Sequence, residues 1–215
     1  MKPTITKTIY FVRHGESDDN YGSTYSGDEA VLSANGVRQA EFVASRLDKL
    51  PIEVILASPL NRARQTAEII NDVLRKPIEF TELLKEVKKP TDLIGKNLES
   101  DEAQKIISQY DLHKNEPDWK YSDEESFNER KNRLIQFVQQ LISQERKNIL
   151  VVSHGGVIRL IMAYMLFGKE MMPEETYRFM NFLRLDNTGV TVCHLWGKDS
   201  WSLANWNDLA HLGDN

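Results

Sequence analysis

The sequence predicts an α/β fold, a three-layer sandwich in which a mainly parallel central sheet is flanked by helices. Two observations support this. Short apolar runs rich in β-branched and aromatic residues alternate with longer segments whose apolar residues recur at helical spacing. The 215 residues, 40% of them apolar, suit one globular domain better than two, and they contain no internal repeat. We therefore treat residues 1–215 as a single domain, with residues 81–125 as a cap-like insertion of helix and loop over the site.

The first part of the chain shows the alternation clearly. Residues 9–12 are too few for a helix and are predicted to form a buried strand. A helix is expected to follow from Ser33 and to end before Pro51. Residues 54–57 form the next predicted strand. The apolar residues of the helix after it are Ala63, Ala67, Ile70 and Leu74, which share one face.

Residues 81–125 interrupt this pattern. Pro90, Gly95 and Pro117 punctuate a mostly polar stretch, which favours an insertion over a further strand and helix. The remaining predicted elements are a helix at residues 126–145, a strand at 149–152, a helix at 157–166 and strands at 189–195 and 201–206. The alternation therefore resumes after the insertion.

Polar residues follow the predicted strands at the points where the strands end. Arg13-His14-Gly15 comes directly after the first strand, and Ser153-His154-Gly155-Gly156 comes after the strand at 149–152. The segment 58–64 follows its strand in the same way. Mainly parallel sheets bind ligands beyond the carboxyl ends of their strands. We expect these three segments to form one site.

Two histidines are candidates for chemistry there. The neutral imidazole of His14 could attack phosphorus, although a lone histidine after a strand is more often a surface loop residue. The glycines after His154 would let the next helix begin close to a phosphate and expose its first amides to it. Taken alone, that motif is explained equally well by a glycine turn. The two histidines together favour the functional interpretation.

Arg62 and Arg64 stand near the start of a predicted helix, where cations oppose the helix dipole. A basic residue in that position is stabilised by an anion. The planar guanidinium groups of Arg13 and Arg62 could hold phosphate oxygens and stabilise the charge of a transferring phosphoryl group. We interpret Arg64 as part of an exposed charged face.

These motifs resemble the histidine phosphatase superfamily, which includes cofactor-dependent phosphoglycerate mutases and related phosphatases. The characteristic Arg-His-Gly tripeptide after the first strand is Arg13-His14-Gly15 in this sequence. The other matching positions, in order, are Asn20, Ser26-Gly27, Leu32-Ser33, Gly36, Ala40, residues 58–67, His154-Gly155-Gly156 and Trp206-Asn207-Asp208. Several spaced motifs in the right order cover most of the chain and make the match specific.

The resemblance implies a phosphomonoester phosphatase that needs no metal and no other cofactor and acts on a small phosphorylated substrate. It implies that His14 is transiently phosphorylated. The residues implied to line the phosphate pocket are Arg13, Arg62 and His154. The resemblance also implies substrate contacts at Asn20, Ser26, Gly27 and Gly155.

The family also places a proton-donating carboxylate within a Leu-x-Glu pattern in the insertion, and Glu86 matches it. Glu82 is a competing candidate, and either residue could instead be a surface glutamate. The Gly-x-x-Glu-Gly stretch that often follows in the family is absent here. The lysines found in its place are Lys88, Lys89 and Lys96. They could contact an anionic substrate, but a solvated run of charges explains them more simply.

Other functions stay open. A phosphoglycerate mutase-type phosphotransferase would use the same residues in a drier pocket, although the chain is short for one. A non-catalytic module that binds a phosphorylated ligand is the alternative from another class. An esterase is set aside, because no Gly-x-Ser-x-Gly elbow exists. The substrate is not identified, since Trp119 and Tyr121 could either line its pocket or anchor the insertion.

Composition limits the partners. The net charge is -5 and the pI is near 5.6, which gives no general field for nucleic acid or an anionic membrane. No apolar segment approaches the ~20 residues of a membrane span. Cys193 is the only cysteine, which excludes an internal disulfide and favours the cytoplasm. Met171, Met172 and residues 179–183 either pack in the core or form a patch for a homodimer.

Overall fold

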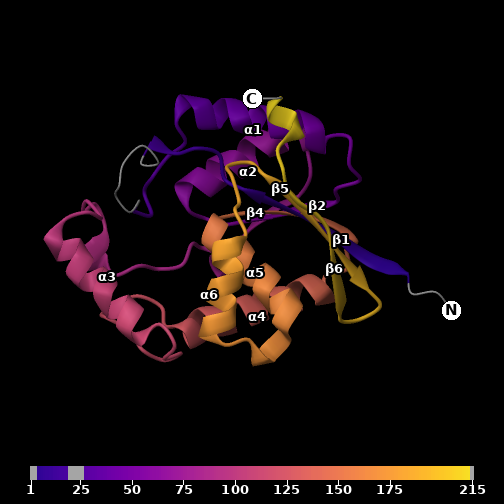
Figure 1. The fold of residues 1–215 in the computed structure, drawn as a ribbon. Coiled ribbons are helices and arrows are strands. Elements are labelled where there is room, and N and C mark those ends of the chain that lie inside the picture. Colours follow the sequence, from indigo (N-terminus) through magenta and orange to yellow (C-terminus); the bar gives the residue numbers. More distant parts are fainter. Residues whose placement is uncertain (1–3, 19–26, 214–215) are drawn as a thin grey trace.

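The computed structural model describes residues 4–18 and 27–213, which form one mixed sheet with helices on both faces (Figure 1). The strands are β1 (Ile5–Arg13), β2 (Val54–Ala57), β3 (Ile78–Phe80), β4 (Asn148–Ser153), β5 (Val190–Trp196) and β6 (Ser200–Asp208). The α-helices are α1 (Ala34–Leu47), α2 (Asn61–Leu74), α3 (Asp101–His113), α4 (Phe127–Ser143), α5 (Gly155–Phe167) and α6 (Pro173–Phe182). Short 3-10 helices are η2 (Glu82–Leu84), η3 (Thr91–Leu93), η4 (Gly168–Glu170) and η5 (Ala210–Leu212).

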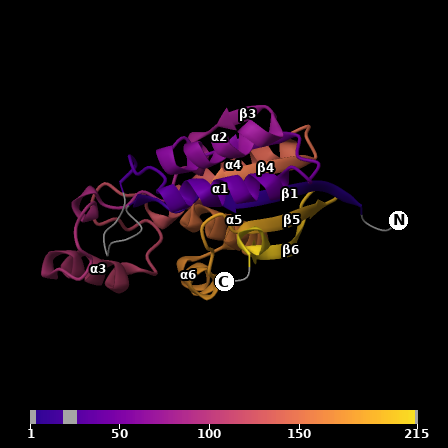
Figure 2. The ribbon, with the colours of Figure 1, turned by 90° about the horizontal axis from the view of Figure 1, so that it is seen from above.

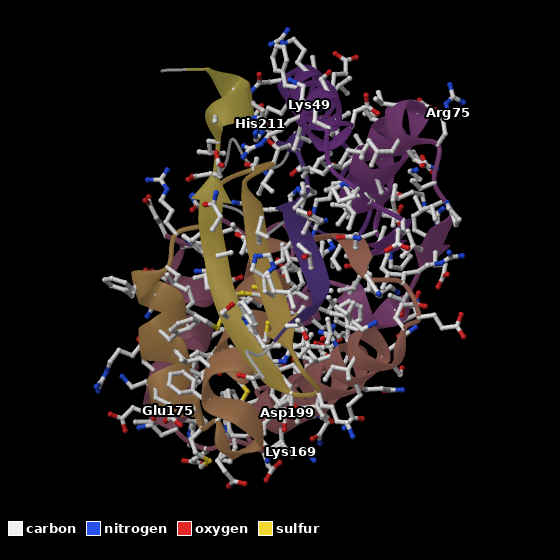
Figure 3. The ribbon with its side chains drawn as sticks, turned by 90° about the vertical axis from the view of Figure 1, so that its right-hand side faces the viewer. Lys49, Arg75, Lys169, Glu175, Asp199 and His211 are labelled. Atoms are coloured by element: carbon white, nitrogen blue, oxygen red, sulfur yellow. The ribbon has the colours of Figure 1, made fainter. Side chains whose placement is uncertain are left out.

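The strand order is β3-β2-β4-β1-β5-β6. The first four strands in that order are parallel, whereas β5 and β6 add an antiparallel hairpin to β1. Asp199 marks the turn of this hairpin in Figure 3, and β6 forms the edge of the sheet. The predicted fold class, an α/β sandwich with a mainly parallel sheet, is confirmed.

The layers follow from the alternation of side chains along the strands. Ile9 and Phe11 of β1 pack with α4 and α5 on one face, and Tyr10 and Val12 pack with α1 and α2 on the other. Figure 1 shows α1 and α2 above the sheet and α4, α5 and α6 below it. Because both faces are covered, β2 and residues 149–152 of β4 form continuous apolar runs.

Local signals explain where several helices begin. The Ser33 hydroxyl accepts a hydrogen bond from the Gly36 amide at the start of α1. At the start of α4, Ser126 and Glu129 form a reciprocal capping box. Helix α6 begins with a proline, Pro173, which needs no hydrogen bond to its nitrogen at that position.

Three elements were not predicted. Strand β3 has only three residues at the sheet edge, too few for a periodic signal. Helix α3 lies inside the insertion, and its only fully covered side chains are Ala103 and Ile106. Helix α6 buries little beyond Pro173 and Thr176, so its sequence lacks a continuous apolar stripe.

The segment between β3 and α4 is the proposed insertion, and Figures 1 and 2 show α3 standing out beyond the end of the sheet. Arg133 of α4 holds the two ends of the insertion together. Its guanidinium binds both carboxylate oxygens of Glu125, at 2.6 and 2.7 Å, and also donates to the carbonyls of Leu83 and Lys85. Leu93, Ala103 and Ile106 form a small separate core within the insertion. In the described ranges, no helix combines the length and apolar character needed to cross a membrane.

Candidate active site

His14 stands at the carboxyl end of β1 and is 4% exposed. Its Nδ1 lies 2.7 Å from the carbonyl oxygen of Gly15, so this nitrogen carries the proton and donates. The lone pair is then on Nε2. Burial lowers the pKa of His14 well below its usual range, and His154, Arg62 and Arg13 lower it further, against a smaller opposite effect of the Gly15 carbonyl. His14 is therefore a neutral imidazole at ordinary pH.

Arg62, in the first turn of α2, reaches the open nitrogen of His14. Its Nε is 3.3 Å from His14 Nε2, and its Nη1 donates to the carbonyl of Gly27 at 3.1 Å. The Thr66 hydroxyl accepts from the Gly15 amide and donates to the Arg62 carbonyl. These two bonds tie the first turn of α2 to the end of β1, which brings Arg62 to the histidine.

Arg13 precedes His14 on β1 and reaches the same pocket from another side. Its Nη1 donates to the carbonyl of Leu185 at 2.7 Å, while its Nε is buried and has no hydrogen-bond partner within the described ranges. Gly155 lies against this side chain, since a Cβ there would stand 3.5 Å from Arg13 Nε. Burial lowers the pKa of Arg13, and the Glu86 carboxylate acts in the opposite direction. The guanidinium of Arg13 is therefore partly removed from water at the carboxyl end of β1.

His154 follows β4, next to β1 in the sheet, and its ring centroid is 5.1 Å from that of His14. Its Nε2 is 2.8 Å from the Ser58 hydroxyl, whereas its Nδ1 is buried and no described residue hydrogen-bonds to it. Burial lowers the pKa of His154 well below its usual range, and Arg62 and Arg13 add to the effect. Ser58 follows β2, so three neighbouring strand ends meet here, as predicted.

Glu86 belongs to the insertion and borders the pocket. Its Oε2 accepts from the Gly156 amide at 3.4 Å, and its Oε1 accepts from the Val87 amide at 2.8 Å. The Ser153 hydroxyl donates to the carbonyl of Leu84, which holds this segment against β4. Glu82 instead forms an exposed ion pair with Lys85. The structure therefore places Glu86, and not Glu82, against the first turn of α5, which begins directly after His154.

The sequence matches the histidine phosphatase superfamily (branch 1) over residues 9–209. The chain belongs to the histidine phosphatase superfamily. It is 29% identical to a probable phosphoglycerate mutase of Proteus mirabilis over 210 residues, which are 96% of this chain and 95% of that protein.

Solved structures of superfamily members agree in fold. A phosphoserine phosphatase from Entamoeba histolytica, crystallised with phosphoserine, has a TM-score of 0.78 at 27% identity and covers 96% of this chain and 99% of that one. An α-ribazole phosphatase from Shigella flexneri also has a TM-score of 0.78 at 27% identity and covers 94% and 97%. The family and the phosphatase class of enzyme that the sequence predicted are confirmed.

The other predicted residues are placed as follows. Asn20 and Ser26 lie outside the described residues. Arg64 lies outside the histidine phosphatase site, with its guanidinium 3.8 Å from the Phe80 ring centroid, and it pairs with Glu68.

The aromatic residues and lysines of the insertion divide between surface and interior. Trp119 stacks on His113 with ring centroids 4.6 Å apart and meets the Tyr110 ring edge-on, so it packs within the insertion, while Tyr121 is 40% exposed. Lys88 and Lys96 form surface ion pairs with Asp123 and Glu102, and Lys89 faces a cavity.

Met171 and Phe179 pack against the core, whereas Phe182 is 85% exposed. A homodimer stays a prediction.

Three positioning residues were not among the predicted site residues. The side-chain amide of Asn187 donates to the carbonyl of His14 at 2.8 Å, and Ser58 and Thr66 hold His154 and Gly15 as described. Ser58 had a signal, because it directly follows a predicted strand. Asn187 had no such signal, because it precedes a strand instead of following one. Strand β5 is antiparallel to β1, so the residues before β5 lie at the same end of the sheet as the residues after β1.

Proposed function

We propose that this phosphatase hydrolyses small phosphomonoesters through a phosphohistidine at His14, without a metal ion. The observation that carries the proposal is the pairing of a buried, neutral His14 with Arg62 at its Nε2. A neutral imidazole has a lone pair for attack on phosphorus. The Arg62 guanidinium beside it supplies the positive charge that a transferring phosphoryl group requires.

Two buried polar atoms further support an anion in this pocket. Arg13 Nε and His154 Nδ1 have no hydrogen-bond partner among residues 4–18 and 27–213. Unsatisfied buried groups of this kind are uncommon and costly unless a ligand completes them. Phosphate oxygens would accept from both side chains. Gly27 and Gly155, which lie against Arg62 and Arg13, would border the bound phosphate, and Asn20 and Ser26 stay part of the proposed substrate site.

In the first step His14 Nε2 attacks phosphorus, the bond from phosphorus to the ester oxygen breaks, and Glu86 gives its proton to the departing alcohol. In the second step water attacks the phosphohistidine, Glu86 takes a proton from that water, and inorganic phosphate leaves. His14 returns to its neutral form. The position of Glu86 at the Gly156 amide, facing the phosphate pocket from the insertion side, supports this role.

The insertion, residues 81–125, is proposed to cap the site and to contact the alcohol part of the substrate. Named relatives act on different esters, which include phosphoserine and α-ribazole phosphate, so they do not select one substrate for this chain. We further propose a cytoplasmic location, since the single cysteine can form no internal disulfide.

A mutase is the second candidate, favoured by the name of the Proteus mirabilis relative. It would need the phosphohistidine to pass its phosphate to a different hydroxyl of the substrate before water reaches it. The two reactions differ in their products. With 3-phosphoglycerate, hydrolysis releases inorganic phosphate, whereas a mutase forms 2-phosphoglycerate with little release.

The test compares wild type with His14→Ala after EDTA treatment, on a panel of phosphomonoesters. Phosphate release and acid-labile phosphate bound to the protein are both followed. We expect wild type to turn over repeatedly and to carry acid-labile phosphate, and we expect His14→Ala to do neither. Activity that depends on added metal, or a His14→Ala variant as active as wild type, would contradict the proposal.

A further inference from the structure

The turn that leads into β5 holds the backbone of two residues of the phosphate pocket. The side-chain amide of Asn187 donates to the carbonyl of His14, and the backbone amide of Thr188 donates to the carbonyl of Arg13 at 3.0 Å. Shortly before the turn, the carbonyl of Leu185 accepts from the Arg13 guanidinium. The orientation of His14 and Arg13 in the pocket therefore depends on the conformation of this turn.

Thr188 has a backbone conformation that its side chain disfavours. Its φ is 56°, in the left-handed region, and the residue is fully buried. The turn closes with a hydrogen bond from the Gly189 amide to the carbonyl of Asp186, so Thr188 is the third of its four residues. Glycine or asparagine normally supplies a positive φ at that position, and a β-branched residue is strained there. Such strain persists only where the surrounding structure enforces it, and it is common at functional sites.

The carboxyl-terminal segment supplies a group that holds Thr188. The Thr188 hydroxyl donates to the carbonyl of Asn187 at 2.8 Å, and its oxygen lies 3.0 Å from His211 Nε2. Because the single hydroxyl proton goes to that carbonyl, His211 Nε2 carries a proton and donates it to the hydroxyl oxygen. Burial lowers the pKa of His211 to about 4, so the ring is neutral at ordinary pH. His211 thus completes the hydrogen bonds of the Thr188 hydroxyl.

The end of β6 makes further hydrogen bonds to the turn and to the residues before it. Asn207 accepts from the Asp186 amide at 2.9 Å and donates to the Asp186 carboxylate at 2.8 Å. The Trp206 indole donates to the carbonyl of Arg184 at 2.7 Å. The contact also requires Gly189, because a Cβ there would stand 2.0 Å from Asn207 Oδ1. The carboxyl-terminal part of the chain therefore fixes the turn at more than one residue.

Asp208 anchors the segment that carries His211. One carboxylate oxygen accepts from the Ala210 amide at 3.0 Å, and the other pairs with Arg46 of α1. Helix η5, which contains His211, packs against α1 (Figures 1 and 3). Asp208 pairs with Val190, the first residue of β5, so the end of β6 lies at the same end of the sheet as the phosphate pocket. His211 is thus presented to the turn from a fixed base.

Resting on the phosphatase function proposed above, we infer that Thr188 and His211 are positioning residues for the attack of His14 on phosphorus. His211 keeps Thr188 in its left-handed conformation. In that conformation the turn directs its two donors to the carbonyls of Arg13 and His14. Both residues act through the turn and not through contact with the substrate, so their loss should lower kcat more than it raises KM.

Two substitutions of Thr188 separate the conformation of the turn from the hydrogen bonds of the hydroxyl. Thr188→Val and Thr188→Gly both remove the hydroxyl, but valine keeps the strain, whereas glycine adopts a positive φ freely. We expect Thr188→Val to lower kcat by about tenfold or more, because a small displacement of a reacting group is costly, and Thr188→Gly to recover about fivefold or more of that loss. Equal losses of kcat in the two variants, or a Thr188→Val variant as active as wild type, would overturn the inference.

A double-mutant cycle tests His211. His211→Ala should lower kcat by about tenfold in the wild-type chain but by about twofold or less in the Thr188→Gly chain, since glycine needs no partner to hold its φ. A role of His211 in stability alone would give the same loss in both chains, and that result would contradict the inference. If valine at position 188 prevents folding, this cycle still decides.

Controls address the fold. Thermal unfolding of each variant shows whether it is folded at the assay temperature. Thr176→Val removes another buried threonine hydroxyl, in α6, to which no described residue hydrogen-bonds, and it should retain kcat. A loss of kcat in Thr176→Val as large as that in Thr188→Val would show that removing any buried threonine hydroxyl impairs the enzyme.

Vanadate binding separates this inference from the proposed function. Vanadate resembles a phosphoryl group in transfer, so its affinity reports the arrangement of the pocket without turnover, and we expect Thr188→Val to bind it about fivefold or more weakly than Thr188→Gly. If wild type hydrolyses phosphomonoesters but the two variants have equal kcat, the phosphatase function stands and the positioning role is wrong. If no ester is hydrolysed but the variants differ in vanadate affinity, the positioning role stands and the proposed hydrolysis is wrong. Without hydrolysis and with equal vanadate affinities, both are wrong.

Discussion

The carboxylate of Glu86 approaches Gly156 so closely that a Cβ at position 156 would stand 2.5 Å from Glu86 Oε1. A side chain at this position would push Glu86 out of its place. Alanine normally stabilises a helix relative to glycine by up to about 1 kcal/mol, so the two effects of Gly156→Ala have opposite signs. We expect kcat to fall by about 10²-fold while the melting temperature holds or rises. Gly155→Ala gives a comparison, because its Cβ would make ordinary contacts of 3.5 Å with Arg13 at the proposed phosphate site, so it should raise KM more than it lowers kcat. An equal loss in both variants would argue against this explanation.

Glu86 and Glu82 should differ sharply as proton donors. Glu86→Gln should lower kcat on alkyl phosphates by about 10² to 10⁴-fold, since it removes general acid and base catalysis. Glu82→Gln should remain near wild type, because Glu82 is exposed and pairs only with Lys85. With p-nitrophenyl phosphate, whose leaving group needs no proton, Glu86→Gln should accumulate phosphohistidine, measurable as acid-labile protein phosphate. A similar loss in both variants would show that the proton donor is neither of them alone.

The buried histidines should make stability depend on pH. The pKa values of His14 and His154 are lowered by burial, whereas unfolded histidine titrates near ~6.5. Below that value the unfolded chain binds protons that the folded chain does not. The free energy of unfolding should therefore fall as pH drops from ~6.5 toward the lowered folded pKa values, by up to about 1.4 kcal/mol per pH unit for each histidine. Denaturant unfolding from pH 7.5 to 5 measures it, and His14→Asn should show a shallower dependence. If the free energy of unfolding depended on pH equally in His14→Asn and in wild type, the buried, neutral state of His14 would be contradicted.

Arg133 should matter for both stability and activity. It binds the Glu125 carboxylate and the carbonyls of Leu83 and Lys85, next to Glu86. Arg133→Met leaves a partly buried carboxylate and two carbonyls without their donor, which should cost about 2–4 kcal/mol of unfolding free energy. Because Glu86 follows Lys85, kcat should fall as well. Lys120→Met removes an equal charge from an exposed pair with Glu129 and should change stability by less than about 1 kcal/mol. Equal effects of the two substitutions would refute the role of Arg133.

Much of the site could be predicted because it follows from strand ends. His14 and His154 come directly after apolar runs that could only be buried strands, and the sheet then brings them together. The family resemblance singled out Glu86, with Glu82 as the competing candidate, but hydrophobic periodicity alone could not place either carboxylate relative to the strand ends. The position of Glu86 depends on Lys85, whose extended backbone, with ψ of 147°, ends η2 and turns the next side chain away from that of Glu82. Such a turn is set by the packing of Leu84 and by the Ser153 hydrogen bond, which join residues distant in sequence.

The helix of the insertion and helix α6, which follows α5, were harder to predict for the same reason. Helices α3 and α6 bury few side chains, so their apolar periodicity is weak even though Ser100 and Pro173 begin them in the usual way. The different surroundings of Lys88 and Lys89 likewise follow from the path of the chain and not from composition.

The place of β1 in the sheet has a consequence for how the enzyme loses activity. His14 sits on a strand with neighbours on both sides, and β4, which carries His154, is one of them. Amide hydrogens on such inner strands exchange only when a domain opens completely, whereas peripheral segments open at lower cost. During denaturation the nucleophile should therefore keep its geometry until global unfolding. The insertion, which we propose contacts the alcohol part of the substrate, should loosen earlier, so selectivity among substrates should decline before hydrolysis does.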